Sequence, residues 1–369
     1  MAQRPAQIAW RRFRRHGPAM AGLVYATVCV LVAILGYLIS PDHTTHANLQ
    51  VLELAKLPPG TQARLLMVPQ PDVPAVSWLR RWWQGQPQQF LPIPLDDASG
   101  LVIRGDFLCF VNRQGQADSV RLSRFGAGPY RLQALEDTRV ERRRFVLGTD
   151  TYGRDLLSRI LLGSRVSLSI GLMAVLLSLA IGLFMGSLAG YFGGWVDQVI
   201  MWLVSVMWSI PTLLMALAIS FVLGRGFWQL FVAIGISMWV EVARIVRGQM
   251  MSLREQPFTE AARALGFRAW RIMFRHVLPN VTSPIIVIAV ANFGAAVLIE
   301  SGLSFLGIGV EVPIPTWGRM IYEGYTYIVF ENGKWLAFFP GLALIMLIVS
   351  INLIGIGLRD ALDVKLANR

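Results

Sequence analysis

The sequence predicts an all-α polytopic membrane protein with six transmembrane helices and a small, mainly β insert on the extracytoplasmic side. Apolar residues make up 54% of the chain and charged residues only 15%, and the mean hydropathy is +0.52, values far from those of a soluble domain. Six segments are long and apolar enough to cross a hydrocarbon core of about 30 Å. They are Pro18–Ser40, Val166–Leu188, Val199–Leu223, Phe227–Val246, Val281–Leu303 and Trp335–Leu358.

Lysine and arginine residues lie mostly on one side of the membrane when the six segments are threaded in order. Such residues accumulate in cytoplasmic loops, so we expect both termini and the loop between the fourth and fifth segments in the cytoplasm. This topology accounts for the net charge of +12 without nucleic acid as a partner. The cytoplasmic groups are Arg4, Arg11, Arg12, Arg14 and Arg15 at the start, Arg247 to Arg275 in the loop, and Arg359, Lys365 and Arg369 at the end.

Three regions follow from this pattern. Residues 1–40 form a basic arm and a first helix, which is too long for a signal-peptide core and is expected to be a retained signal anchor. Residues 41–145 form the extracytoplasmic insert. Residues 146–369 form the transmembrane domain, with a polar loop at 252–280.

The insert is expected to be a small, mainly β module. A run of prolines between Leu57 and Pro94 argues against long helices there. Alternating runs over Leu101–Val111 and Ser119–Phe125 predict short strands on either side of a turn at Asn112–Gly115. Three tryptophans could pack in the module's core or at the membrane interface, and we expect the core. They are Trp78, Trp82 and Trp83.

An amphipathic helix is expected directly after the insert. Apolar residues from Leu156 to Leu161 alternate with a polar side made by Arg154, Asp155, Ser158 and Arg159. This pattern predicts a structural helix along the outer membrane surface, which ends near Gly163 where the second span begins.

Small residues recur every four positions in the second span. They are Ser178, Gly182, Gly186, Gly190 and Gly194. This spacing places them on one face of a helix and predicts close approach of a neighbouring helix, either as static packing or as a sliding interface.

Two carboxylates lie within the spans. Glu241, inside the fourth span, would cost roughly 2.5–3.5 kcal/mol in lipid, so we expect it to pair with Arg244 or to face the bundle interior. Glu300, near the outer end of the fifth span, is expected to be solvated. An ion relay would need more such groups than the spans contain.

The loop between the fourth and fifth spans carries the most informative pattern in the chain. Its residues predict two short helices, hinged at Gly266 and closed by Pro279. On the second helix, apolar residues fall at i, i+3, i+4 and i+7, while arginines line another face. This predicted pair of short helices could equally dock into a groove of a partner protein or contact anionic lipid. The apolar residues are Trp270, Met273, Phe274 and Val277.

The loop after the fifth span, Leu303–Gly318, is apolar but rich in glycine and proline. It cannot be a regular helix throughout, and irregular backbone at membrane depth must be buried in protein or line a wet cavity. The loop is therefore either a packing element or a wall of a translocation path. The path candidates are Ser304, Phe305, Gly307, Gly309 and Trp317.

No catalytic motif stands out in the sequence. The phosphate-loop pattern G-x-x-x-x-G-K-[ST] does not occur, nor do H-E-x-x-H, a Cys/His cluster with metal-ligand spacing or a nucleophile elbow. We therefore expect no enzyme activity, and we predict no catalytic residue, metal site or cofactor.

At these residues the chain resembles the C-type inner-membrane permease subunits of bacterial ATP-binding-cassette (ABC) importers for dipeptides, oligopeptides and nickel. The family's general motif is E-A-A, three residues, G, nine residues, then I-x-L-P. The matching residues are Glu260, Ala261, Ala262, Gly266, Leu278 and Pro279, with His276 in place of the isoleucine.

Further matches run outward from that loop. Leu147–Asp155 resembles the family's L-G-T-D-x-x-G-R-D, and Leu303–Gly309 resembles L-S-F-L-G-x-G. Pro313–Gly318 resembles P-x-P-x-W-G, and Gly357–Asp363 resembles G-L-R-D-A-L-D, with Val364 where proline is usual. The insert is longer than is typical of the family and carries none of its motifs.

The resemblance implies a type I importer permease of the bacterial inner membrane. Its partners would be a second permease, cytoplasmic ABC ATPases, an extracytoplasmic binding protein and membrane lipid. The loop would be the coupling helix that links ATPase closure to the bundle. The coupling residues would be Glu260, Ala261, Ala262, Gly266, Trp270, Met273, Phe274, Leu278 and Pro279.

The expected solutes are di- and oligopeptides, with nickel or another small solute as the alternative. The glycine-rich face and Glu241 also leave open a different class, an ion-coupled secondary transporter.

Overall fold

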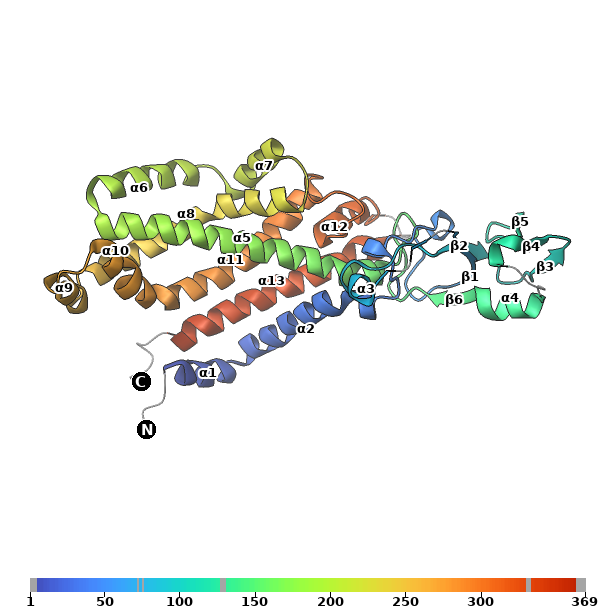
Figure 1. Cartoon of the computed structure of the whole chain (residues 1–369), viewed down its shortest axis with the longest axis horizontal. Coiled ribbons are helices and arrows are strands. Elements are labelled where there is room, and N and C mark those ends of the chain that lie inside the picture. The colour runs from blue at the N-terminus through green and yellow to red at the C-terminus, as the bar shows by residue number, and fades with distance from the viewer. Residues whose placement is uncertain (1–4, 72, 75, 127–130, 330–332, 363–369) are drawn as a thin grey trace. The chain divides into compact units, whose positions relative to one another are not determined.

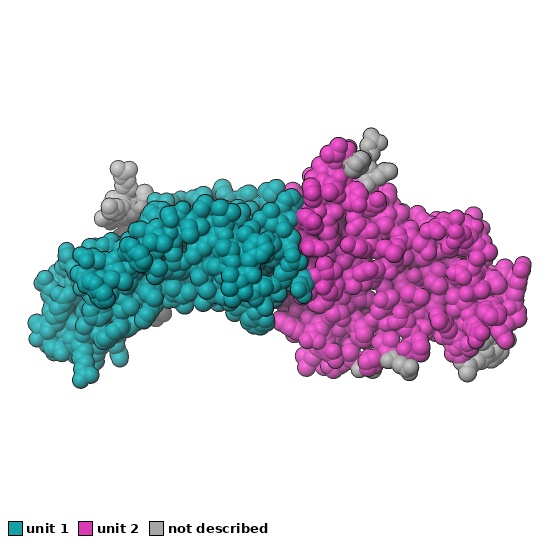
Figure 2. All heavy atoms as spheres, turned by 90° about the horizontal axis from the view of Figure 1, so that it is seen from above, with its two compact units in different colours: residues 1–30, 166–311, 344–369 teal, residues 31–165, 312–343 magenta. Residues whose placement is uncertain are grey.

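The computed structural model describes residues 5–71, 73–74, 76–126, 131–329 and 333–362. The chain divides into two compact units, coloured separately in Figure 2. Unit 1 comprises residues 1–30, 166–311 and 344–369, and unit 2 comprises residues 31–165 and 312–343.

Five helical stretches are long and apolar enough to cross a membrane, which confirms the predicted polytopic helical class (Figure 1). A shorter helix, α1 (Pro5–Arg15), precedes the first of them. The five are α2 (Gly17–Ile39), α5 (Leu156–Phe192), α8 (Phe227–Arg254), the stretch Ala269–Phe305 that ends in α11 (Thr282–Phe305), and α13 (Lys334–Leu362).

The third predicted span, Val199–Leu223, is broken rather than straight. It consists of α6 (Gly194–Trp208) and α7 (Thr212–Leu223), which meet at 92°. The break coincides with Pro211, whose ring and missing N–H prevent the helix from continuing. A bidentate ion pair connects the first turn of α6 to α8. Arg247 of α8 donates from Nε and Nη2 to the two carboxylate oxygens of Asp197, at 2.5 and 2.6 Å.

Helix α5 runs without interruption for 37 residues, so the expected separate surface helix before Gly163 is wrong. Gly163 does not break the helix. A methyl group placed there would lie 3.1 Å from the ring of Trp317, so the missing side chain makes room for the indole of α12 (Trp317–Tyr325).

The glycine face of α5 packs directly against α8, as the four-residue spacing predicts. A methyl group at Gly182, Gly186 or Gly190 would lie 2.5–2.6 Å from a Val242 side chain or an α8 carbonyl oxygen. Gly194 does not take part, because α5 ends at Phe192. These three glycines set the separation between the two helices.

We predict that Gly186→Ala lowers the free energy of unfolding by about 1–3 kcal/mol, because the added methyl would overlap the carbonyl oxygen of Ala243. Gly248→Ala is the matched control, since this exposed α8 glycine has nothing within 4 Å of the position of a methyl group. Thermal unfolding in detergent would measure both. Equal effects would contradict the proposed close contact.

The insert contains two three-stranded antiparallel sheets, which confirms a small β module. In the first, β1 (Gln62–Pro69) lies between β2 (Phe90–Leu95) and β6 (Val140–Arg144). In the second, β4 (Phe107–Val111) lies between β3 (Val102–Arg104) and β5 (Ala117–Arg121), and the predicted turn at residues 112–115 joins β4 to β5. Short helices complete the module, namely η1 (Thr45–Ala47), η2 (Leu52–Leu54), α3 (Trp78–Gln84), η3 (Leu122–Phe125) and α4 (Leu132–Arg139).

The core of the insert is mainly aliphatic, and each of its two buried clusters contains one buried phenylalanine. The larger cluster consists of Leu66, Val68, Leu95, Leu101, Leu108, Phe110, Leu122 and Leu135. The smaller one consists of Val51, Leu54, Ala63, Leu65 and Phe145. The expectation that the tryptophans pack in the core is wrong, because Trp78 and Trp83 of α3 are 73% and 60% exposed.

Candidate functional site

The loop after α8 begins with a compact helix, α9 (Pro257–Ala264). Proline suits the first turn because its missing N–H would have no partner there in any case. The buried Thr259 donates its hydroxyl to the carbonyl oxygen of Leu253 at 2.9 Å, which ties α9 back to the end of α8.

The chain turns at Gly266 directly after α9, as the predicted hinge between two short helices requires. Its φ of +74° lies in the left-handed region, where a side chain is strained. The amide of Phe267 donates to the carbonyl of Ala262 and that of Gly266 to the carbonyl of Arg263, the two bonds of a Schellman cap. The chain therefore turns sharply at Gly266 and keeps its last carbonyls satisfied.

The second half of the loop differs from the predicted short helix closed by Pro279. It runs from α10 (Ala269–Ile272) through a π-helical turn, η4 (Met273–Val277), and a 3₁₀ turn, η5 (Leu278–Val281), directly into α11. Pro279 stands in the first turn of η5, where no N–H is needed, so it does not end the helical path.

The expected single apolar face on this segment is divided in two. Met273 and Val277 are fully buried, whereas Trp270 and Phe274 are exposed and stack on each other with ring centres 5.9 Å apart. The wider π turn changes the angular spacing along the segment, so the i, i+3, i+4, i+7 positions no longer share one face.

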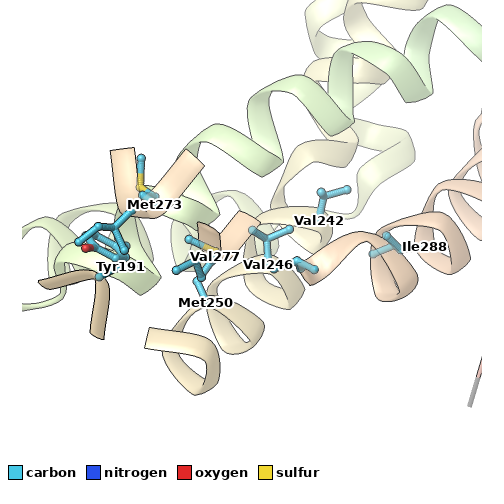
Figure 3. Close-up of a cluster of buried hydrophobic side chains, with 10 residues drawn as sticks. Tyr191, Val242, Val246, Met250, Met273, Val277 and Ile288 are labelled. Carbon is cyan, nitrogen blue, oxygen red and sulfur yellow. The ribbon is translucent and has the colours of Figure 1, made fainter. Parts of the chain in front are cut away.

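The loop rests on a buried apolar cluster, shown in Figure 3. Residues from α5, α8, α9, α10, η4, η5 and α11 meet there without a charged group among them. They are Tyr191, Val242, Val246, Met250, Ala262, Ile272, Met273, Val277, Val281 and Ile288. Ala262 and Met273 thus belong to the base of the loop, and Leu278 packs against it.

The outward surface of the loop is apolar at its tip and basic around it. Leu265 is 73% exposed, and Phe258, Glu260, Ala261 and Gly266 are also exposed. Several exposed arginines surround this tip: Arg263, Arg268, Arg271 and Arg275.

Glu241 does not form the expected pair with Arg244. Its carboxylate is exposed and makes no hydrogen bond or ion pair within the described part of the chain. Arg244 instead lies over the ring of Trp208, with its guanidinium carbon 3.0 Å from the ring centre. Both residues line a cavity of about 220 Å³ beside the bend between α6 and α7.

Glu300 is fully buried, so the expectation that it is solvated is wrong. Its carboxylate accepts hydrogen bonds from the hydroxyls of Ser167 at 3.1 Å, Ser304 at 2.8 Å and Ser301 at 3.4 Å. Three hydroxyl donors replace water around the carboxylate.

The path candidates divide into packed and open positions. Ser304 is buried on Glu300, and a methyl group at Gly309 would overlap Ser304. Trp317 is buried and donates its ring N–H to the carbonyl of Ile160 at 3.0 Å. Phe305 is 38% exposed, and Gly307 has open space around it.

Unit 2 contains a buried network of charges that the sequence pattern did not predict. Arg154, which has no exposed surface, donates to Asp150 at 2.5 Å and to Glu323 of α12 at 3.0 Å. Arg159 is also buried and lies 3.4 Å from Asp150. Arg319 also pairs with Glu323, at 3.2 Å. Three arginines and two carboxylates therefore join the start of α5 to α12.

Asp155 beside this network is held by Ser158, whose amide and hydroxyl both donate to the carboxylate. Burial raises the pKa of the Asp155 carboxyl above its ordinary value, and the two hydrogen bonds oppose this.

We predict that Arg154→Ala destabilises the protein by about 3–5 kcal/mol, because it removes the shortest ion pair of the buried Asp150 and one partner of the half-buried Glu323. The exposed Arg124→Ala in the insert is the control, with a change within about 0.5 kcal/mol. Thermal unfolding in detergent would measure both. A loss for Arg154→Ala no larger than for the control would contradict the role of the network.

Two family models match the chain. The model described as binding-protein-dependent transport system inner membrane component matches residues 178–368, which include α6 to α13 and the loop that carries α9. The chain belongs to this family. A second model, the N-terminal transmembrane domain of oligopeptide transport permease C, matches residues 4–59. Residues 60–177, which hold both sheets of the insert, lie outside both matches.

Curated relatives in this permease family are about 40% identical to the chain. The dipeptide transport system permease protein DppC of Alkalihalophilus pseudofirmus is 41% identical over 59% of this chain and 71% of its own length. The di/tripeptide transport system permease protein DppC of Pseudomonas aeruginosa is 43% identical over 61% of this chain and 74% of its own.

The glutathione transport system permease protein GsiD of Pectobacterium atrosepticum is 41% identical over 60% of this chain and 72% of its own length. Among solved structures, the inward-facing MetNI methionine ABC transporter is similar at 18% identity. That match covers 56% of this chain and 98% of the other, with a TM-score of 0.46.

Proposed function

We propose that the protein is one permease subunit of an ABC importer in the bacterial inner membrane and that its solutes are di- and oligopeptides. The family match supports the permease role, and the names of the relatives support the solute class, since they are permeases for dipeptides, di- and tripeptides and glutathione. We place both termini and the α9 loop in the cytoplasm, on the evidence of the arginines that flank the spans.

The observation that carries the proposal is the construction of the α9 loop. An exposed apolar tip at Leu265 sits at a capped turn, and buried contacts to α5, α8 and α11 hold its base. A displacement of the tip would therefore be transmitted to these three spans, because their side chains and those of the loop base are closely packed. We propose that this tip, from Glu260 to Gly266, docks in a groove of a cytoplasmic ATPase, and that Trp270 and Phe274 form a second exposed contact.

A second permease subunit is proposed as the neighbour of the α6–α8 side. An unpaired carboxylate at the middle of a span is costly in lipid, so Glu241 requires either a wet cavity or a protein partner. We propose that the cavity beside Glu241 and Arg244 opens on the translocation path between two permeases. Phe305, which is exposed, and Gly307, which has open space around it, continue that path, while Ser304 and Gly309 support its wall.

An extracytoplasmic binding protein is the remaining partner in this proposal. It would deliver the peptide on the side of the membrane that bears the insert, and it would set most of the specificity.

We predict that Gly266→Val uncouples ATP hydrolysis from transport. The substitution strains the left-handed turn by roughly 1–2 kcal/mol and adds bulk to the docking tip. Peptide-stimulated ATP hydrolysis and peptide uptake by the reconstituted complex would measure the effect, and both should fall by an order of magnitude or more.

Gly115→Val in the insert is the matched control. Gly115 has a φ of +80° and, like Gly266, nothing within 4 Å of a methyl position, so the backbone strain is the same but the site is different. Peptide-stimulated ATP hydrolysis and peptide uptake should remain normal in this variant. Equal losses in the two variants, or normal coupling in Gly266→Val, would refute the proposed docking role.

A further inference from the structure

Helix α3 of the insert has one apolar face that the rest of the insert leaves uncovered. Trp78, Leu79, Trp82 and Trp83 fall at i, i+1, i+4 and i+5 and so share a face. Trp78, Leu79 and Trp83 are 73%, 55% and 60% exposed.

The opposite face of α3 is polar. Arg80 donates to the side chain of Gln84 one turn on, at 3.2 Å, and Arg81 is exposed beside them. The helix therefore combines bulky aromatic groups with two arginines, neither of which forms an ion pair with a residue that the structure describes.

Backbone contacts within unit 2 fix α3 at the end of a membrane span. The residue after Gly85, Gln86, donates its amide to the carbonyl of His43 at 3.0 Å and accepts from the amide of Thr45 at 3.1 Å. His43 is only four residues beyond Ile39, where α2 ends. The C-terminus of α3 is therefore held at the level where the chain leaves the bilayer.

Side chains from two spans strengthen this attachment. Arg165 of α5 donates to the carbonyl of Trp83 at 3.0 Å, and its guanidinium lies 4.7 Å from the centre of the Trp83 ring. The same guanidinium lies 5.2 Å from the ring of Tyr37 in α2. A methyl group at Gly85 would overlap that tyrosine ring, so α3 and the end of α2 are in close contact.

The end of α2 in unit 2 also presents an apolar surface that is exposed among the described residues. Its exposed residues are Leu31, Ile34, Leu35, Leu38 and Ile39. Because α2 is a membrane span, this surface faces lipid or another transmembrane chain, and the C-terminal end of α3 lies where α2 ends.

We propose that α3 is an interfacial anchor whose tryptophan face lies in the bilayer leaflet on the insert's side. Tryptophan prefers the boundary between headgroups and acyl chains, because its ring is apolar and its N–H is polar. Arg80 and Arg81 on the other face then reach lipid phosphates. Lipid is the occupant that fits, because the helix is fixed at the height of the headgroups and combines tryptophans with cations.

This anchor gives the insert a defined orientation toward the membrane. The two sheets are tied to α3 through β2, which begins six residues after α3 ends. The proposal does not depend on the solute or on the ATPase, so it can be tested in the permease alone.

Spin labels on the two faces of α3 test the proposal. Cys29 and Cys109 are the only cysteines, and both are free, so a background with Cys29→Ala and Cys109→Ala accepts single labels. Leu79→Cys places a label on the tryptophan face, and Gln84→Cys places one on the polar face of the same helix. The labelled chain is reconstituted in vesicles of phosphatidylethanolamine and phosphatidylglycerol.

The measurement is the collision rate of each label with oxygen, which concentrates in lipid, and with a water-soluble nickel chelate. We expect the ratio of oxygen to nickel collisions at Leu79→Cys to exceed that at Gln84→Cys several-fold and to approach that at Leu38→Cys in the span. Trp78→Cys, on the same face, should repeat the result of Leu79→Cys.

Two results would overturn the proposal. A ratio at Leu79→Cys equal to that at Arg124→Cys, an exposed site in the insert, would place the face in water. A label at residue 79 that neither reagent reaches would mean that protein covers the face.

Discussion

The close contact between α5 and α8 is the constraint on which the rest of the helical unit depends. Three glycines bring the two backbones together, and the apolar cluster beneath the α9 loop is built on the α8 face that results. If the helices stood farther apart, Tyr191 of α5 would separate from Val246 and Met250 of α8 in that cluster (Figure 3). Motion at the loop and motion of the spans are linked through this one packed layer.

The two carboxylates within the spans, Glu241 and Glu300, differ in whether the chain supplies them with hydrogen-bond donors. Glu300 is surrounded by serine hydroxyls and acts as part of the packed structure, whereas Glu241 lies beside a cavity and has no partner among the described residues. Buried ions need matched partners, and the network of Arg154 with Asp150 and Glu323 meets this need with opposite charges. An ion without a partner is therefore the feature that points to something outside the chain.

Patterns that act over a few residues predicted the structure well. The helical class, the glycine face, the turn at Gly266 and the β4–β5 hairpin each follow from spacing or composition within one segment. The membership in the permease family, inferred from motifs, is confirmed by the family match. The coupling residues around Glu260 remain a prediction.

Features that depend on distant residues could not be predicted in the same way. The burial of Glu300 requires Ser167, which lies 133 residues away in α5, and the charge network requires Glu323 from α12. The π turn that hides Met273 but exposes Phe274 depends on how η4 meets α8. The aromatic face of α3 was misassigned because composition alone does not distinguish a protein core from a lipid interface.

The most direct test of the central claim is photo-crosslinking at the tip of the α9 loop. A benzoylphenylalanine replaces Leu265 in the intact transporter, and a second variant carries it in place of the exposed Gln114 in the insert. Our account predicts a covalent adduct between position 265 and an ATPase subunit, and none between position 114 and that subunit. Adducts of position 265 with lipid alone, or with a protein on the insert's side of the membrane, would contradict it.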